Sequence, residues 1–171
     1  MIELAELTDA VIVEGAKMPG HVPASFGRNM GVGGSKGSIC GNHAMNRADL
    51  AIIVGAREVC QWDCSGTAWK EAKRIINFNT LPHYAGHYNN SIPILGEAKQ
   101  NLRHLIDYLK QTGWTPRQKE SEWYRENKEK KAEWKAFKAL RYENPVLVDP
   151  RRGIKLLTQP AAVHIACGFA V

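Results

Sequence analysis

Short apolar runs and amphipathic segments alternate along the chain. Continuous apolar runs predict buried strands, and the run LAIIVG is typical of a central strand in a parallel sheet. These predicted strands cover residues 10–14, 50–55, 74–79 and 92–95. Helical patterning predicts helices over 2–8, from Ser35 to about Arg47, and over 97–113, whose apolar positions are Leu102, Leu105, Ile106 and Leu109.

The order of these elements predicts an α/β fold. Strands that alternate with helices favour a doubly wound parallel sheet with right-handed crossovers. Residues 15–34 are punctuated by Gly and Pro and predict a long loop, and Gly113 is a plausible end for the last of these helices. A helical C-terminal extension follows this α/β part.

Composition limits the class of protein. The 171 residues are 44% hydrophobic and 23% charged, which is ordinary for a globular chain with one principal domain. No apolar run approaches the roughly 20 residues that cross a bilayer, so no membrane partner is expected. The first ten residues, MIELAELTDA, lack a basic region, and the four cysteines therefore indicate reduced thiols in the cytoplasm.

The net charge of +6 is concentrated in residues 116–141, which hold nine Lys or Arg and five Glu. Charges of opposite sign at short spacing, such as Glu126 and Lys130, predict a solvated helix stabilised by ion pairs. Nucleic acid is not an expected partner, because the interspersed Glu residues would repel phosphates. We predict three parts: an α/β domain over 1–114, a charged helical linker over 115–157, and the start of a further domain over 158–171.

The glycine-rich stretch MGVGGSKGS, residues 30–38, is a candidate binding loop. Its glycines fit neither the G-x-G-x-x-G nor the G-x-x-x-x-G-K-[ST] phosphate motif. A helix that starts near Ser35 would direct free N–H groups at an anion. Alternatively, the stretch is a tight turn that packs a helix against the sheet.

A second candidate is a Cys/His set formed by Cys60, Cys64, His83 and His87. Both pairs have three intervening residues, but the gap between the pairs is longer than in zinc fingers. We therefore favour two thiols and two loop imidazoles over zinc, and predict no metal site. The carboxylates are scattered, so no catalytic residue is predicted either.

Three segments together resemble the central domain of thiamine-diphosphate-dependent enzymes. They are GHVPASFGRNMGVGGSKGSICGNHAMNRADLAIIVGAR (20–57), EAKRIINFNT (71–80) and LGEAKQNLRHLIDYL (95–109). Similar members are acetolactate synthase and the trihydroxycyclohexanedione acylhydrolase of inositol breakdown. The FNT ending and the Trp-bearing charged helix look more like the acylhydrolase. Residues 157–171, LTQPAAVHIACGFAV, resemble the opening helix of the diphosphate-binding domain.

The resemblance implies a nucleotide site, usually for FAD, at the carboxyl ends of the strands. The synthase has a second Arg where this chain has Gln61, so weak FAD binding is expected. The positions implied are Gly31, Val32, Gly33, Gly34, Gly55, Arg57, Asn79, Thr80 and Glu97.

The same resemblance implies the parent reaction, which is cleavage or ligation of a C–C bond next to a carbonyl. That chemistry needs an activating Glu and a G-D-G…N motif for Mg²⁺ and thiamine diphosphate, and this sequence contains no G-D-G. Both ends look cut, and the opening strand with its Gly turn is missing. We therefore expect a scaffold fragment of a cyclic-dione hydrolase that does not bind thiamine diphosphate alone and that partners with the remaining domains in a homo-oligomer. The alternatives are a fragment of an acetolactate synthase-like carboligase and a stand-alone nucleotide-binding or interaction subunit.

Overall fold

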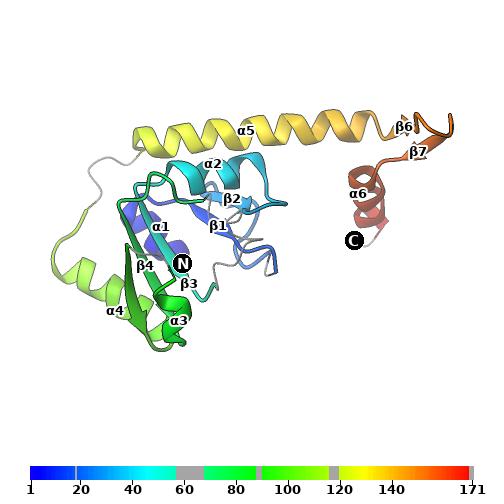
Figure 1. The fold of residues 1–171 in the computed structure, drawn as a ribbon. Coiled ribbons are helices and arrows are strands. Elements are labelled where there is room, and N and C mark those ends of the chain that lie inside the picture. The colour runs from blue at the N-terminus through cyan, green and yellow to red at the C-terminus, as the bar shows by residue number, and fades with distance from the viewer. Residues whose placement is uncertain (18, 57–67, 88–89, 116–119, 170–171) are drawn as a thin grey trace. The chain divides into compact units, whose positions relative to one another are not determined.

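A computed structural model describes residues 1–17, 19–56, 68–87, 90–115 and 120–169 (Figure 1). The chain forms two compact units, Met1–Lys131 and Ala132–Val171, and each is described by itself. The two units do not test the predicted division into three parts, because they are separated by spatial compactness rather than by domain ancestry.

The first unit confirms the predicted α/β class. Strands β1 and β2 pair in parallel, and β3, β4 and β5 form a parallel sheet in that order. The strands are β1 (Ile12–Glu14), β2 (Asn29–Val32), β3 (Leu50–Val54), β4 (Arg74–Asn79) and β5 (Ser91–Leu95). The helices are α1 (Ile2–Thr8), α2 (Ile39–Arg47), α3 (Pro82–Ala85), α4 (Ala98–Gln111) and the start of α5 (Glu122–Glu143).

Three local predictions were wrong. The predicted loop over 15–34 contains β2, whose four residues include only two apolar ones, Met30 and Val32, so its apolar pattern is weak. Helix α2 begins after Ser38 rather than near Ser35, because the Ser38 side chain accepts a hydrogen bond from Gly41 N–H. The apolar run at 50–54 is not central: in the described part of the chain β3 pairs only with β4. The short helix α3 was not predicted.

The core lies on both faces of β4. On one face Phe78 packs with Leu4 of α1 and with Leu102 and Ile106 of α4. On the other face Ile75 packs with residues of β3. The apolar stripe predicted for α4 is therefore the face that covers the sheet, as its period of about 3.6 residues requires.

Ion pairs between side chains at the surface also connect α1 and α4. The Glu3 carboxylate lies 2.6 Å from Lys110 Nζ and 3.1 Å from Arg103 Nη1. The hydrogen bond from Lys110 is the main reason why the pKa of Glu3 lies below its ordinary value, with smaller contributions from the charges of Lys110 and Arg103. Glu3 is thus stabilised as a carboxylate in the folded chain.

We expect Glu3→Gln to lower the free energy of unfolding at neutral pH but not in acid. A carboxylate with a lowered pKa contributes stability above its unfolded pKa, and this contribution is lost as the pH falls through the folded pKa. Urea unfolding at neutral pH and at a pH below both values measures the difference. Glu6→Gln on the same helix is the control, and an equal loss for Glu3→Gln at both pH values would contradict the ion-pair explanation.

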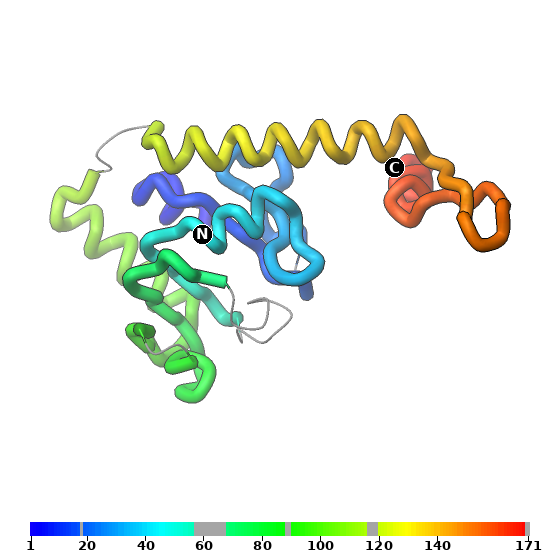
Figure 2. Tube along the Cα trace, turned by 45° about the horizontal axis from the view of Figure 1, so that its top comes forward, coloured from blue at the N-terminus to red at the C-terminus, as the bar shows by residue number. Residues whose placement is uncertain are grey.

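The first turns of α5 belong to the first unit and pack against the rest of it (Figures 1 and 2). His43 Nε2 lies 2.7 Å from Glu126 Oε1, and the Arg28 guanidinium lies 4.0 Å from the centre of the Tyr124 ring. Lys131 Nζ donates to the carbonyl oxygen of Phe26 at 2.8 Å. The predicted solvated helix is therefore docked along this part of its length.

The second unit contains the rest of α5, an antiparallel hairpin and a helix. The hairpin pairs β6 (Val146–Val148) with β7 (Lys155–Leu157), and α6 (Gln159–Phe169) follows. Tyr142 stacks on His164 with ring centres 4.0 Å apart. The helical C-terminal part is confirmed, whereas the hairpin within the predicted linker was not expected. Among the described helices, none is both long and apolar enough to cross a membrane.

Candidate functional site

Three of the predicted site positions meet at the carboxyl ends of β3, β4 and β5. Gly55 follows β3, Asn79 ends β4, and Glu97 comes two residues after β5. Gly55 N–H donates to Phe78 O at 2.9 Å, and Gly96 N–H donates to Asn79 O at 3.1 Å. In parallel α/β sheets this edge is where ligands bind.

Asn79 connects the turns at this edge. It is 7% exposed, its Nδ2 donates to Ala56 O at 3.0 Å, and its Oδ1 accepts from Leu81 N–H at 3.4 Å. An amide nitrogen carries two hydrogens, and within the described part of the chain Ala56 O is the one acceptor found for this Nδ2. Thr80, the next residue, is exposed.

Gly55 and Glu97 contribute different groups to this edge of the sheet. Gly55 has φ of +64°, a conformation that favours glycine, and a Cβ at this position would meet nothing within 4 Å. Glu97 is exposed and caps α4 by accepting from Gln100 N–H at 2.9 Å. The edge thus offers an open backbone position at Gly55 and a carboxylate that is already occupied by a helix end.

The backbone N–H groups of the turn at 31–34 are largely used within the chain. Those of Gly31, Gly33 and Gly34 donate to Asn29 Oδ1 (2.7 Å), Glu14 O (3.1 Å) and Asn42 Oδ1 (2.8 Å). Three N–H groups that a phosphate would need are therefore occupied. Nucleotide contacts at this turn and at Val32 stay a prediction.

Close packing explains two of the four glycines in the stretch 30–38, and also Gly41 in α2. A Cβ on Gly33 would collide with Met45 Sδ, and a Cβ on Gly37 would lie 2.6 Å from Gly33 C. A Cβ on Gly41 would lie 2.5 Å from Val32 O. Glycine here lets α2 approach β2 and the turn after it, as in the packing interpretation of the sequence.

Glycine is needed at position 31 for a different reason, which is the backbone conformation. The register between β1 and β2 shifts, so that two residues along β1 oppose three along β2. Gly31 lies at this irregularity with φ of +73°. A bulge with a left-handed residue favours glycine.

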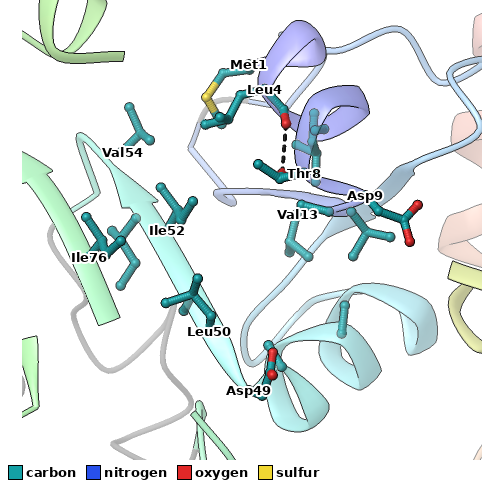
Figure 3. A pocket seen from close by; sticks show the side chains of 18 of the residues that line it. Met1, Leu4, Thr8, Asp9, Val13, Asp49, Leu50, Ile52, Val54 and Ile76 are labelled. Atoms are coloured by element: carbon teal, nitrogen blue, oxygen red, sulfur yellow. Dashed lines mark hydrogen bonds between the residues drawn. The ribbon is translucent and has the colours of Figure 1, made fainter. Parts of the chain in front are cut away.

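An apolar cavity of about 470 Å³ lies beside β3 and was not predicted from the sequence. Figure 3 shows Leu50, Ile52 and Val54 along β3 on one side of it and Val13 of β1 on another. The sequence signal for this cavity was the continuity of the apolar runs at 11–13 and 50–54. A strand with one face in water alternates apolar and polar residues instead.

Several predicted positions lie outside the described residues, namely Arg57, Cys60, Gln61 and Cys64. The nucleotide contact implied at Arg57 and the Cys/His set are therefore untested. Over the described ranges, no group of three or more His, Cys, Asp or Glu side chains is placed to hold a metal ion.

The fold and this edge of the sheet indicate the class of protein to which the chain belongs. The sequence model of the family "Thiamine pyrophosphate enzyme, central domain" matches residues 1–105, and the chain belongs to this family. It is 31% identical over 110 residues to the 3D-(3,5/4)-trihydroxycyclohexane-1,2-dione hydrolase of Listeria innocua, a match that covers 64% of this chain and 17% of the hydrolase. It is 27% identical over 112 residues to the acetolactate synthase of Mycobacterium avium, covering 65% of this chain and 18% of the synthase. The matched region thus spans less than a fifth of these relatives.

Proposed function

We propose that this chain is the central part of a thiamine-diphosphate-dependent enzyme that cleaves a C–C bond next to a carbonyl in a cyclic dione. The family match over residues 1–105 carries the proposal, and the similarity to the Listeria innocua hydrolase favours this substrate class. The similarity to an acetolactate synthase favours a carboligase as the second candidate.

The proposed role of this part is a scaffold for the rest of the enzyme. The residues of this chain do not fit Mg²⁺ and thiamine diphosphate, because the sequence contains no G-D-G and the described residues hold no cluster of metal-binding side chains. Other domains would hold that cofactor, which supplies the carbanion chemistry when bound. A cytoplasmic location, which is plausible for relatives that are metabolic enzymes, and assembly into a homo-oligomer belong to the same proposal.

Exchange of the matched segment tests the substrate class. Residues 1–105 of this chain would replace the corresponding segment of the Listeria innocua hydrolase and, separately, of the Mycobacterium avium synthase. We expect dione hydrolysis to be retained in the first chimera and acetolactate formation to be lost in the second. Calorimetric binding of thiamine diphosphate checks that each chimera is folded, and the reverse outcome in folded chimeras would favour the carboligase.

We further propose a weak nucleotide site at the carboxyl ends of β3, β4 and β5. The open position at Gly55 and the second Nδ2 hydrogen of Asn79 would suit a diphosphate and a ribose hydroxyl, with Thr80, Glu97 and Arg57 as further contacts. Neutral Gln61 supplies no charge-assisted contact, which is worth roughly 1.5–3 kcal/mol.

Gln61→Arg should therefore tighten FAD binding about tenfold to a hundredfold. Titration of the full chain with FAD, followed by flavin fluorescence, measures the affinity. Gln111→Arg, which adds the same charge at the end of α4, should leave it unchanged. Equal tightening by both variants would show that net charge, rather than a site, attracts the flavin.

A further inference from the structure

The docked segment of α5, residues 122–131, contacts the rest of the first unit without a buried apolar side chain. In α5 the one buried residue is Asn127, whose Nδ2 donates to Trp123 O of the same helix at 2.9 Å. Within the described part of the chain no donor lies within hydrogen-bond distance of Asn127 Oδ1. Burial of this oxygen opposes docking, because the oxygen loses water and gains no partner. Helix α4 differs, since it buries Leu102 and Ile106 against the sheet.

Charged side chains make the contact in the middle of this segment. Glu126 Oε1 lies 2.7 Å from His43 Nε2 and 3.7 Å from Arg47 Nε, both of which belong to α2. The side chains of Glu126, His43 and Arg47 are 35%, 20% and 50% exposed, so water and salt reach the contact. Ion pairs exposed to this degree stabilise only weakly and are screened by salt.

Polar groups also make the contacts at the two ends of the segment. Directly before it, Ser121 N–H donates to Asp9 Oδ2 at 3.3 Å. At its last residue, Lys131 Nζ donates to the carbonyl oxygen of Phe26 at 2.8 Å. The aromatic side chains at its start, at positions 123 and 124, are only half-buried. The segment is therefore docked mainly by polar contacts.

The core of the first unit does not include this segment. The apolar clusters around Phe78 and Ile75 contain residues of the sheet, α1, α4 and the turns beside them, and none of α5. The Asp9 carboxylate, which accepts from Ser121 N–H, also lies 2.5 Å from Arg28 Nη2 at the start of β2. Release of α5 would therefore leave the core packed and this ion pair in place.

We propose that residues 122–131 form a salt-sensitive latch, which releases from the first unit while the α/β core stays folded. Elements with few buried apolar contacts open locally at a lower free energy than the core does. The latch is closed at low ionic strength, where the contacts of Glu126 and Lys131 are strong, and it opens as salt screens them. Because α5 continues past Lys131, the latch determines whether the beginning of this helix is fixed to the first unit. It does not depend on the proposed function.

Hydrogen exchange of the full chain at two salt concentrations tests the latch. Between about 0.01 M and about 1 M NaCl the Debye length falls from about 30 Å to about 3 Å. A helix without tertiary contacts is only marginally stable in water, so the amides of a released segment exchange faster. We expect exchange of the amides of residues 122–131 to accelerate about threefold or more at the higher salt concentration. The amides around Ile106 of α4, which apolar contacts hold, should change little.

Two matched pairs of variants test the contacts that close the latch. We expect Glu126→Gln to accelerate exchange of residues 122–131 about threefold or more at low salt and to reduce its salt dependence, because the charge is removed. Glu129→Gln makes the same change of charge at an exposed position of α5 and should do neither. Lys131→Met tests the end of the latch in the same way, with Lys128→Met at a position that is 63% exposed as its control. Circular dichroism checks that all four variants are folded.

The amides of β4 show whether release is separate from unfolding of the core. We expect their exchange to stay slow under the conditions that release residues 122–131. Equal exchange of residues 122–131 at both salt concentrations, acceleration of the β4 amides by the same factor, or equal effects of a variant and its control would each overturn the proposal.

Discussion

Gly41→Ala should destabilise the first unit by about 1–2 kcal/mol, although alanine is the better helix former. In an isolated helix this substitution would gain about 1 kcal/mol. In this chain the new Cβ would lie 2.5 Å from Val32 O and 3.0 Å from Val32 C, and backbone atoms cannot rotate out of the way. Forced contacts of this kind typically cost 1–3 kcal/mol, sometimes more. Urea unfolding followed by circular dichroism measures the change.

Gly168→Ala in α6 is the matched control. A Cβ on Gly168 would meet nothing within 4 Å, so the helix propensity of alanine acts there without a collision. We expect no loss of stability for this variant. If Gly41→Ala also left stability unchanged, α2 would not pack on β2 as closely as the structure shows, and the glycine at position 41 would need another explanation.

Phe78→Ala should have a still larger effect, about 3–5 kcal/mol, because it empties the centre of the core. Phe78 is 1% exposed and packs between β4 and the helices α1 and α4. A loss of this size is a large share of the 5–15 kcal/mol that stabilises a typical domain. We therefore expect a much lower urea midpoint and faster exchange of amides throughout β3 and β4.

Phe169→Ala separates the loss of a buried ring from the loss of any ring. Phe169 is 86% exposed, and substitutions at such positions usually change stability by no more than about 0.5 kcal/mol. Similar effects of the two substitutions would contradict the placement of Phe78 in the core.

The candidate site was predictable to the extent that it depends on strand ends. Gly55 and Asn79 come at the ends of two strands that their apolar residues predict, and parallel strands bring their carboxyl ends to one edge. The partners of Asn79 at Ala56 O and Leu81 N–H were not predictable, because they depend on how two turns approach each other. For the same reason only the structure shows that the N–H groups of the glycine turn are already occupied.

Periodic apolar residues by themselves determined the strands at 50–54, 74–79 and 91–95 and the buried face of α4, since these patterns are local and strong. Tertiary structure decided what a local pattern does not contain. The position of β3 at an edge depends on pairing between distant segments, and the start of α2 depends on a Ser38 N–H that donates to Val32 O at 2.7 Å. The glycine at 41 is needed only because α2 returns to lie on β2, and that approach of one segment to another is a property of the folded chain.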